Sequence, residues 1–231
     1  MEELVKQATI DFNRYFNSFK GLSEEHKKNF NIKKDHSLRV AEITGLLAEK
    51  LELEEEDKNL AQLIGLYHDI DRFKQLIEYD TFHDAKSVDH AELSAQVIEE
   101  EKLFTELDEE KRKLVVLAIR FHNKLALPKG MSENELFYSK LLRDADKLDI
   151  YKVLTDYYLN TKSEPNHTLT WELPKGKSVS PKVAKEILAE RLVSKENVQS
   201  EIDVKIMQLS WVYDLNFRPS FGMLLQQRYL N

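Results

Sequence analysis

Hydrophobic residues recur every three or four positions along most of the chain, which is the spacing of one face of an α-helix. The segment Glu2–Phe19 is the first example, because its apolar side chains return at intervals of three and four residues. The same periodicity predicts a succession of further helices. They cover Lys34–Leu51, Asp57–Asp69, Asp89–Leu103, Asp108–Asn123, Glu133–Leu159, Pro181–Leu192 and Ser200–Asn216.

Residues that interrupt or cap helices support these boundaries. The chain contains only 6 glycines and 5 prolines, so few turns are marked and the helices between them are long. Ser132 and Glu135 form a capping-box pattern at the start of the longest predicted helix. Ser180 followed by Pro181 is typical of a helix N-cap and its first turn.

One segment departs from the helical pattern. Asn166–Leu173 alternates between apolar and polar residues as a strand does, so we expect a small irregular or hairpin arm near residues 165–176. No internal repeat or convincing linker divides the chain. The pattern therefore predicts an all-α fold, a single-domain helical bundle that covers residues 1–231.

The composition is that of a globular chain with an acidic surface. Hydrophobic residues make up 42% and charged residues 32%, and the net charge is -7. This balance disfavours nonspecific binding to nucleic acid, which depends on Lys and Arg against phosphates. It is compatible with a small phosphorylated ligand, because a metal ion can supply positive charge locally.

Several other classes are excluded or disfavoured. The chain has no cysteine, which excludes disulfides, thiolate metal sites and cysteine nucleophiles and favours a cytoplasmic location. The segment Met1–Phe12 lacks a basic stretch followed by an apolar core, so we expect no signal peptide. No apolar run reaches the length of a membrane span, so no membrane partner is expected. The sequence leaves homo-oligomerisation open.

Polar residues on the apolar stripes are the strongest functional signal. His36 precedes Val40, Ile43 and Leu47 at helical spacing, so it lies on an inward face. A single histidine there is usually a hydrogen-bonded core residue. A set spread over several helices is harder to explain in that way, because each buried polar group needs a partner. The set is His36, His68, His90, His122 and Asp146, with Asp69 adjacent to His68.

These residue types are ligands for Fe, Mn, Ni or Zn. Their number exceeds what one ion with open positions needs, and Asp69 could bridge two ions. The chain has seven histidines. We expect the remaining three, His26, His83 and His167, to be solvated or loop residues, although His83 could lie near the mouth of a site.

The ordered pattern His36, His68-Asp69, His90, His122, Asp146 resembles the HD-domain superfamily of metal-dependent phosphohydrolases, in its dinuclear branch. The similarity covers about residues 30–155, and we expect residues 156–231 to form a C-terminal helical extension. The segments that carry it are "DHSLRVAEITGLLAEKL", "LIGLYHDIDRF", "VDHAELSAQVI", "AIRFHNK" and "LLRDADKLDIY".

The resemblance implies a bundle of the HD-domain type and hydrolysis of a phosphate ester or anhydride by a metal-activated hydroxide. It implies one or two divalent transition-metal ions, with Fe or Mn favoured and Ni, Co, Zn or Mg compatible. The implied substrate is a nucleotide or another small phosphorylated metabolite. The implied ligands are His36, His68, Asp69 and Asp146 for one ion, and His90, His122 and the shared Asp69 for the second.

Asp69 is the implied catalytic residue. Arg72, one turn beyond His68, and Lys124, just past His122, are candidates for binding the substrate phosphate. Asp144 is an alternative to Asp146 as the last ligand, since the two cannot share one helix face. Asp71 stands where the family often has glycine or alanine, and nothing in the sequence explains it.

Other functions remain open at this point. The glycine-tyrosine-proline signature of cyclic-di-GMP phosphodiesterases is absent, and Asp71-Arg72-Phe73 stands in place of the Glu-Asp pair of alarmone hydrolases. A noncatalytic metal- or nucleotide-binding regulator would use the same ligands without turnover. A di-iron oxygenase could use the same ligand order and would require iron and dioxygen.

Overall fold

The computed structural model describes residues 1–159 and 173–227, and in that part of the chain every regular element is a helix. This confirms the predicted all-α fold. Two compact units are present, Met1–Asp149 and Ile150–Asn231, and the helix α7 runs through the boundary between them. The prediction of a single domain over residues 1–231 stays a prediction.

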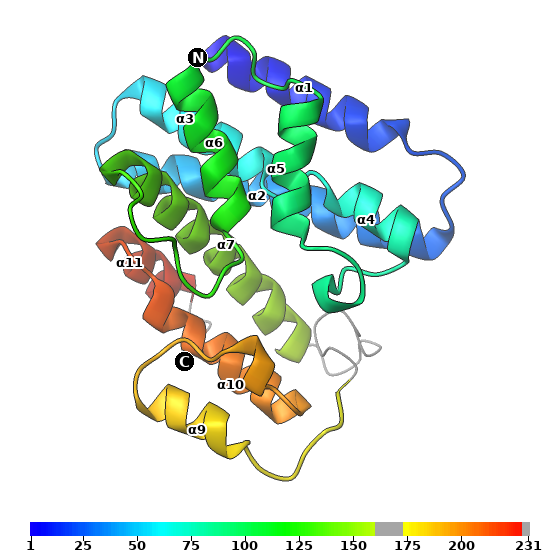
Figure 1. Ribbon diagram of the computed structural model, residues 1–231, viewed down its shortest axis with the longest axis vertical. Helices are drawn as coiled ribbons and strands as arrows, with labels where there is room; N and C mark the ends of the chain where they lie inside the picture. The colour runs from blue at the N-terminus through cyan, green and yellow to red at the C-terminus, as the bar shows by residue number, and fades with distance from the viewer. Residues whose placement is uncertain (160–172, 228–231) are drawn as a thin grey trace. The chain divides into compact units, whose positions relative to one another are not determined.

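The helices that begin in the first unit are drawn from blue to yellow-green in Figure 1. They are α1 (Glu2–Ser18), α2 (Glu24–Lys50), α3 (Glu55–Tyr67), α4 (Arg72–Tyr79), the 3-10 turn η1 (Asp84–Lys86), α5 (His90–Glu100), α6 (Glu109–Phe121) and α7 (Glu133–Leu159).

The second unit contains α9 (Pro181–Leu188), η2 (Lys195–Asn197), α10 (Glu201–Ser210), η3 (Trp211–Asp214) and α11 (Arg218–Gln227). Its core is a small cluster of Val183, Val193 and Met207. The predicted arm lies mostly outside the described residues, and residues 173–176 form neither helix nor strand. In the described part of the chain, no helix is long and apolar enough to cross a membrane.

Two helix beginnings illustrate how the sequence signals act. The capping box forms as predicted, with the backbone N–H of Ser132 2.7 Å from a carboxylate oxygen of Glu135, and α7 has its predicted bounds. In contrast, α2 begins at Glu24 rather than at the predicted Lys34. Ser23 accepts a hydrogen bond from the backbone N–H of His26 at 3.1 Å and so starts the helix earlier.

Helices α2 and α3 approach each other closely at Gly65. A Cβ added to Gly65 would lie 2.9 Å from the backbone of both Val40 and Ala41 and 2.7 Å from the hydroxyl of Thr44. Only glycine allows the two backbones to approach in this way. The contact matters for the site because His36 belongs to α2 and His68 follows α3.

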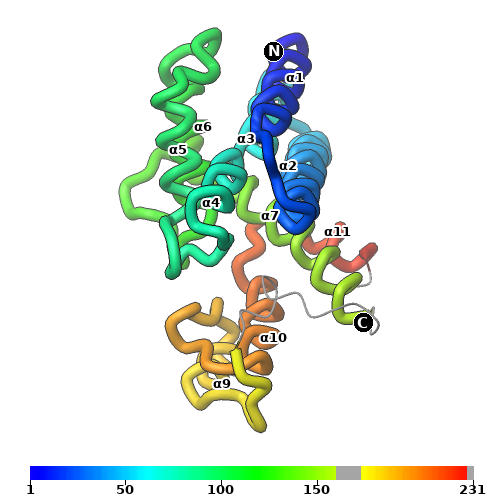
Figure 2. The backbone as a smooth tube through the Cα atoms, turned by 90° about the vertical axis from the view of Figure 1, so that its right-hand side faces the viewer, coloured from blue at the N-terminus to red at the C-terminus, as the bar shows by residue number. Residues whose placement is uncertain are grey.

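Helix α1 and helix α4 meet over an aromatic core. Phe12, Phe30 and Phe73 are fully buried, and the rings of Phe30 and Phe73 are 5.1 Å apart between centroids. Tyr67 at the end of α3 donates a hydrogen bond to the backbone of Ala8 in α1 at 2.9 Å. Figure 2 shows α1 beside α3, with α5 and α6 as a neighbouring pair. This packing holds the ends of α3 and α4 in place.

The Gly65 contact predicts a difference between two glycine substitutions. Gly65→Ala should lower the free energy of unfolding by about 1–3 kcal/mol, because backbone atoms cannot make room for the new methyl group. Gly45→Ala is the matched control on the same interface. Its Cβ would meet only the end of the Gln62 side chain, which can move, and helix propensity should make this variant neutral or up to about 1 kcal/mol more stable. Urea unfolding checks both, and equal stabilities for the two variants would contradict the close approach.

Candidate metal centre

Four imidazole rings meet in two pairs inside the first unit. His36 lies in α2 and His68 is the C-cap of α3, and their Nε2 atoms are 3.2 Å apart. His90 is the first residue of α5 and His122 is the C-cap of α6, and their Nε2 atoms are 3.1 Å apart. All four side chains are buried. Two pairs of ring nitrogens therefore face each other away from solvent.

Two of the rings are fixed by the helices that end beside them. The Nδ1 atom of His68 donates to the backbone oxygen of Gly65, and that of His122 donates to the backbone oxygen of Ile119, each at 2.7 Å. In both cases the acceptor lies three residues earlier in the same helix. Because a carbonyl oxygen only accepts, Nδ1 carries the hydrogen and the neutral ring presents a bare lone pair at Nε2.

The other two rings are fixed by carboxylates. The Nδ1 atom of His36 lies 2.7 Å from Oδ2 of Asp149, and the Nδ1 atom of His90 lies 2.6 Å from Oδ2 of Asp84. A carboxylate that holds one ring nitrogen is the usual arrangement behind a metal-binding histidine, because it sets the tautomer and raises the basicity of the other nitrogen.

The spacing of the facing nitrogens fits a shared cation. When both rings of a pair carry their hydrogen on Nδ1 only, two lone pairs face each other and no hydrogen bond joins them. Two nitrogen ligands that are each about 2.1 Å from one metal ion lie about 3.0–3.4 Å apart for tetrahedral to octahedral angles. The observed separations of 3.2 Å and 3.1 Å fall in this interval.

Carboxylates complete both pairs. Oδ1 of Asp146 lies 3.2 Å from Nε2 of His36 and 3.7 Å from Nε2 of His68. Oδ2 of Asp69 lies 3.8 Å and 3.6 Å from the same two nitrogens. We call His36, His68 and Asp146, together with Oδ2 of Asp69, the first group.

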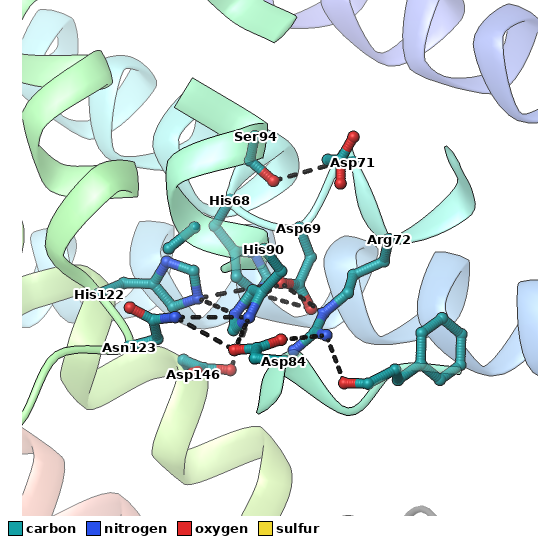
Figure 3. Close-up of polar contacts among 12 residues, drawn as sticks. His68, Asp69, Asp71, Arg72, Asp84, His90, Ser94, His122, Asn123 and Asp146 are labelled. Carbon is teal, nitrogen blue, oxygen red and sulfur yellow. Dashed lines mark hydrogen bonds and ion pairs between the residues drawn. The ribbon is translucent and has the colours of Figure 1, made fainter. Parts of the chain in front are cut away.

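The second group is His90 and His122 together with Oδ1 of Asp69. This oxygen lies 3.5 Å from Nε2 of His90 and 3.8 Å from Nε2 of His122. It is buried and accepts no hydrogen bond from the described residues. Figure 3 shows Asp69 with His90 and His122. Asp69 therefore turns one oxygen to each group. Among the described residues, His36 with His68 and Asp146, and His68 with Asp69 and His122, are close enough to hold a metal ion.

The electrostatics differ between the two groups. In the first, burial disfavours the charged ring of His36, but hydrogen bonds to Asp146 and Asp149 outweigh it and raise the pKa. An added positive charge, proton or metal ion, therefore stabilises the first group. In the second, burial lowers the pKa of His90 and lowers that of His122 well below its usual value. Both rings are then neutral near pH 7 and present lone pairs.

Asp69 stays ionised although it is buried. Burial opposes its negative charge, but Lys33, His68 and Arg72 together hold the pKa of this carboxyl well below its usual range. The ammonium group of Lys33 lies 2.8 Å from Oδ2 of Asp69. Burial likewise opposes the charge of Asp146, and its hydrogen bond with His36 lowers the pKa.

The structure thus brings all six predicted ligands together, and it pairs each of the two predicted phosphate contacts with an aspartate. Asp146, rather than Asp144, supplies the carboxylate of the first group. The Nη1 atom of Arg72 donates to three acceptors, among them Asp84 at 3.1 Å. Lys124 forms an ion pair with Asp89, the N-cap of α5. The phosphate-binding roles of Arg72 and Lys124 stay predictions.

The histidines set aside from the sequence take different places. His26 lies in the first turn of α2, where its ring pairs with Asp80 at 2.7 Å. His83 precedes η1 and is half-buried. His167 lies outside the described residues.

Sequence reasoning missed several residues that support the centre. Lys33 and Arg39 lie three positions on either side of His36, and Asp149 lies three positions after Asp146, so helical spacing was a usable signal for these three. Asp84 lies in a short turn without periodicity, and no comparable signal points to it. Arg143 was also missed; its guanidinium donates to the backbone oxygen of His122 at 3.1 Å and so holds the end of α6.

A separate cavity of about 390 Å³ lies at the beginnings of α3 and α6, whereas His68 and His122 lie at their ends. Asp57, Lys111 and Tyr138 are among its lining residues, and none of the six predicted ligands borders it. At the centre itself, Asp146 and Asp84 have side chains that are 16% and 27% exposed.

A helical unit with a buried centre of imidazoles and carboxylates defines an all-α protein with residues that could hold a metal ion. A family model for the HD domain matches residues 34–151, which is just over half of the chain and includes all six predicted ligands. The chain therefore belongs to the HD-domain family, and this confirms the resemblance drawn from the sequence.

Two further comparisons were informative in a more limited way. No curated protein sequence matches the chain. A crystal structure of a predicted HD-superfamily hydrolase from an uncultured Thermotogales bacterium is similar, with 20% sequence identity and a TM-score of 0.43. The match covers 73% of this chain and 80% of that one.

Asp71 lies apart from the two groups, as Figure 3 shows. Its side chain is fully buried, and neither carboxyl oxygen has a hydrogen-bond partner among the described residues. Burial is the main reason that the pKa of Asp71 rises from 3.8 to about 8. The group is therefore protonated in the folded protein at neutral pH.

The burial of Asp71 predicts that Asp71→Asn raises the free energy of unfolding by an amount that depends on pH. Between pH 3.8 and about 8 the unfolded chain loses the Asp71 proton while the folded chain keeps it, so this residue lowers stability as the pH rises. The free energy of unfolding of the variant should exceed that of wild type by about 2–4 kcal/mol at pH 7, and the two values should become similar near pH 4. Urea unfolding of metal-free protein across this pH range measures the difference. The exposed Asp156→Asn is the control, and a constant difference for Asp71→Asn at all pH values would contradict the assignment.

Proposed function

We propose that the protein is a metal-dependent phosphohydrolase that cleaves a phosphate ester or anhydride bond in a small metabolite such as a nucleotide. The observation that carries this proposal is the position of Asp69. Its two oxygens are divided between two pairs of imidazoles whose Nε2 atoms face each other at 3.2 Å and 3.1 Å. Two adjacent cation positions joined by one carboxylate suit a reaction that displaces one oxygen on phosphorus by another.

The residues fit one or two divalent transition-metal ions, with Fe or Mn favoured, because neutral imidazoles and carboxylates are ligands for these ions. When bound, such ions acidify a water molecule and supply positive charge beside a phosphoryl group. The residues of the chain orient the ligand atoms and keep the carboxylates ionised. The rings are held in a single tautomer by their Nδ1 partners, and Asp69 and Asp146 are held ionised by the cations and imidazoles around them.

Positive side chains around the centre favour an anionic substrate despite the net charge of -7. Lys33 lies 2.8 Å from Asp69, and its side chain is 18% exposed. Arg39 and Lys124 are about one-third exposed, at 32% and 31%. We propose that the phosphate oxygens of the substrate approach the centre next to these cationic side chains.

The proposed reaction adds one water molecule across a phosphorus–oxygen bond. The water oxygen becomes bonded to phosphorus, the bond to the leaving oxygen breaks, and a proton ends on that leaving oxygen. No nucleophilic side chain forms a covalent intermediate in this scheme, which agrees with the absence of cysteine.

The proposal predicts the outcome of a combined metal and activity measurement. Freshly purified protein should contain a transition metal by elemental analysis, and it should release inorganic phosphate from members of a panel of nucleotides and sugar phosphates. Asp69→Asn should reduce both metal content and turnover, the latter by at least about 100-fold, because one neutral amide cannot replace the shared carboxylate. Asp80→Asn is the control, since Asp80 is an exposed carboxylate that only pairs with His26.

Other outcomes would select a different function. Turnover that requires dioxygen and iron, without phosphate release, would make the protein an oxygenase. Metal and nucleotide binding without product formation would make it a regulator. Full activity in metal-free protein, or in Asp69→Asn, would overturn the proposal.

A further inference from the structure

We propose that two separate arginine–aspartate–histidine relays each set one metal position, and that Arg72 is the positioning residue of the second. The relays are Arg39–Asp149–His36 for the first group and Arg72–Asp84–His90 for the second. This inference rests on the metal sites of the proposed function. It gives Arg72 a role different from the phosphate contact that its sequence position suggested.

The first relay joins α2 to α7. Oδ2 of Asp149 lies 2.7 Å from Nδ1 of His36. Arg39 donates two hydrogen bonds to the same carboxylate. Its Nε atom donates to Oδ1, and its Nη2 atom donates to Oδ2 at 2.9 Å. The side chain of Asp149 is 1% exposed and lies between His36 and Arg39. The ring of His36 is therefore held by a carboxylate that is itself held by an arginine.

The second relay has the same construction at a different place in the chain. Oδ2 of Asp84 lies 2.6 Å from Nδ1 of His90. Nη1 of Arg72 donates to Oδ1 of Asp84 at 3.1 Å and to the backbone oxygen of Phe82 at 2.8 Å, and Figure 3 shows these contacts as dashed lines. The side chain of Arg72 is only 10% exposed. Its charge is thus directed at the segment between α4 and α5.

Gln75 also forms hydrogen bonds with the segment between α4 and α5. Nη1 of Arg72 donates to the side-chain oxygen of Gln75 at 2.7 Å, which leaves the amide nitrogen of Gln75 facing the segment. That nitrogen donates to Ser87 at 2.8 Å, to the backbone oxygen of Val88 at 3.1 Å and to Asp84 at 3.3 Å. Gln75 is fully buried. Two residues of α4 therefore fix the turn that carries Asp84.

The two positions differ in how much they depend on their relays. Asp149 is part of a long helix, whereas Asp84 lies in the 3-10 turn η1. The first group also has Asp146, whereas the second group has His90, His122 and only the shared Asp69. Outer partners of a metal ligand typically change metal affinity about 10–100-fold. Loss of the Arg72 relay should therefore weaken the second position selectively.

The test is calorimetric titration of metal-free protein with Mn²⁺, together with elemental analysis after dialysis. Wild type should bind two ions. Asp84→Asn and Arg72→Met should each weaken one of them by at least about tenfold and leave the other within about threefold. Asp149→Asn should weaken the other ion, and the double variant Asp84→Asn with Asp149→Asn should lose tight binding of both.

Matched variants separate positioning from folding. Lys74→Met removes a cation from the same helix at a side chain that is 42% exposed, and it should leave both ions unchanged. Gln75→Leu keeps the charge of Arg72 and should weaken the same ion as Asp84→Asn. If circular dichroism shows that Arg72→Met does not fold, the Mn²⁺ titrations of Asp84→Asn and Gln75→Leu test the proposal instead.

The possible results are distinct. Equal weakening of both ions in Asp84→Asn, no weakening of either, or weakening of the same ion in Asp84→Asn and Asp149→Asn overturns the two-relay proposal. Wild-type protein that binds a single ion also overturns it, and leaves the proposed function standing. Wild-type protein that binds no metal overturns the proposed function itself.

Discussion

The carboxylate of Asp69 is the interaction on which the centre depends. Its side chain is 3% exposed, and an ionised carboxylate at such a place needs compensating positive charge. Lys33 and Arg72 supply part of it, on Oδ2 and beside Oδ1 respectively. On one side of it, burial keeps the rings of His90 and His122 neutral so that they present lone pairs, and on the other side hydrogen bonds to carboxylates favour a positive charge on His36. A metal ion in each group would satisfy the carboxylate and the rings together.

The C-terminal ends of α3 and α6 position two of the rings beside this carboxylate. His68 and His122 stand at the C-caps of α3 and α6, and each donates to a carbonyl of its own last turn. The carbonyl on α3 belongs to Gly65, the residue that lets α3 approach α2 and thereby His36. Backbone packing and ring orientation are consequently set by the same few residues. The site is a product of how the helices terminate and pack, with no long loop required.

Much of this centre could be predicted from the sequence because its ligands lie on regular helices. His36, His90 and Asp146 share stripes with apolar residues, and periodicity alone places them inward. Asp84 could not be found in this way, because it reaches His90 from a short turn whose position is set by Arg72 and Gln75. The beginning of α2 was missed because Ser23 starts the helix within a strongly polar stretch. Asp71 could be marked as unusual, but its burial depends on tertiary packing.

Electron paramagnetic resonance of Mn²⁺-loaded protein tests the central claim most directly. If Asp69 joins two adjacent positions, two Mn²⁺ ions per chain should give an exchange-coupled signal, and Asp69→Asn should abolish the coupling. A signal from isolated Mn²⁺ in wild-type protein, or no bound Mn²⁺ at all, would contradict the account of a shared carboxylate between two metal positions.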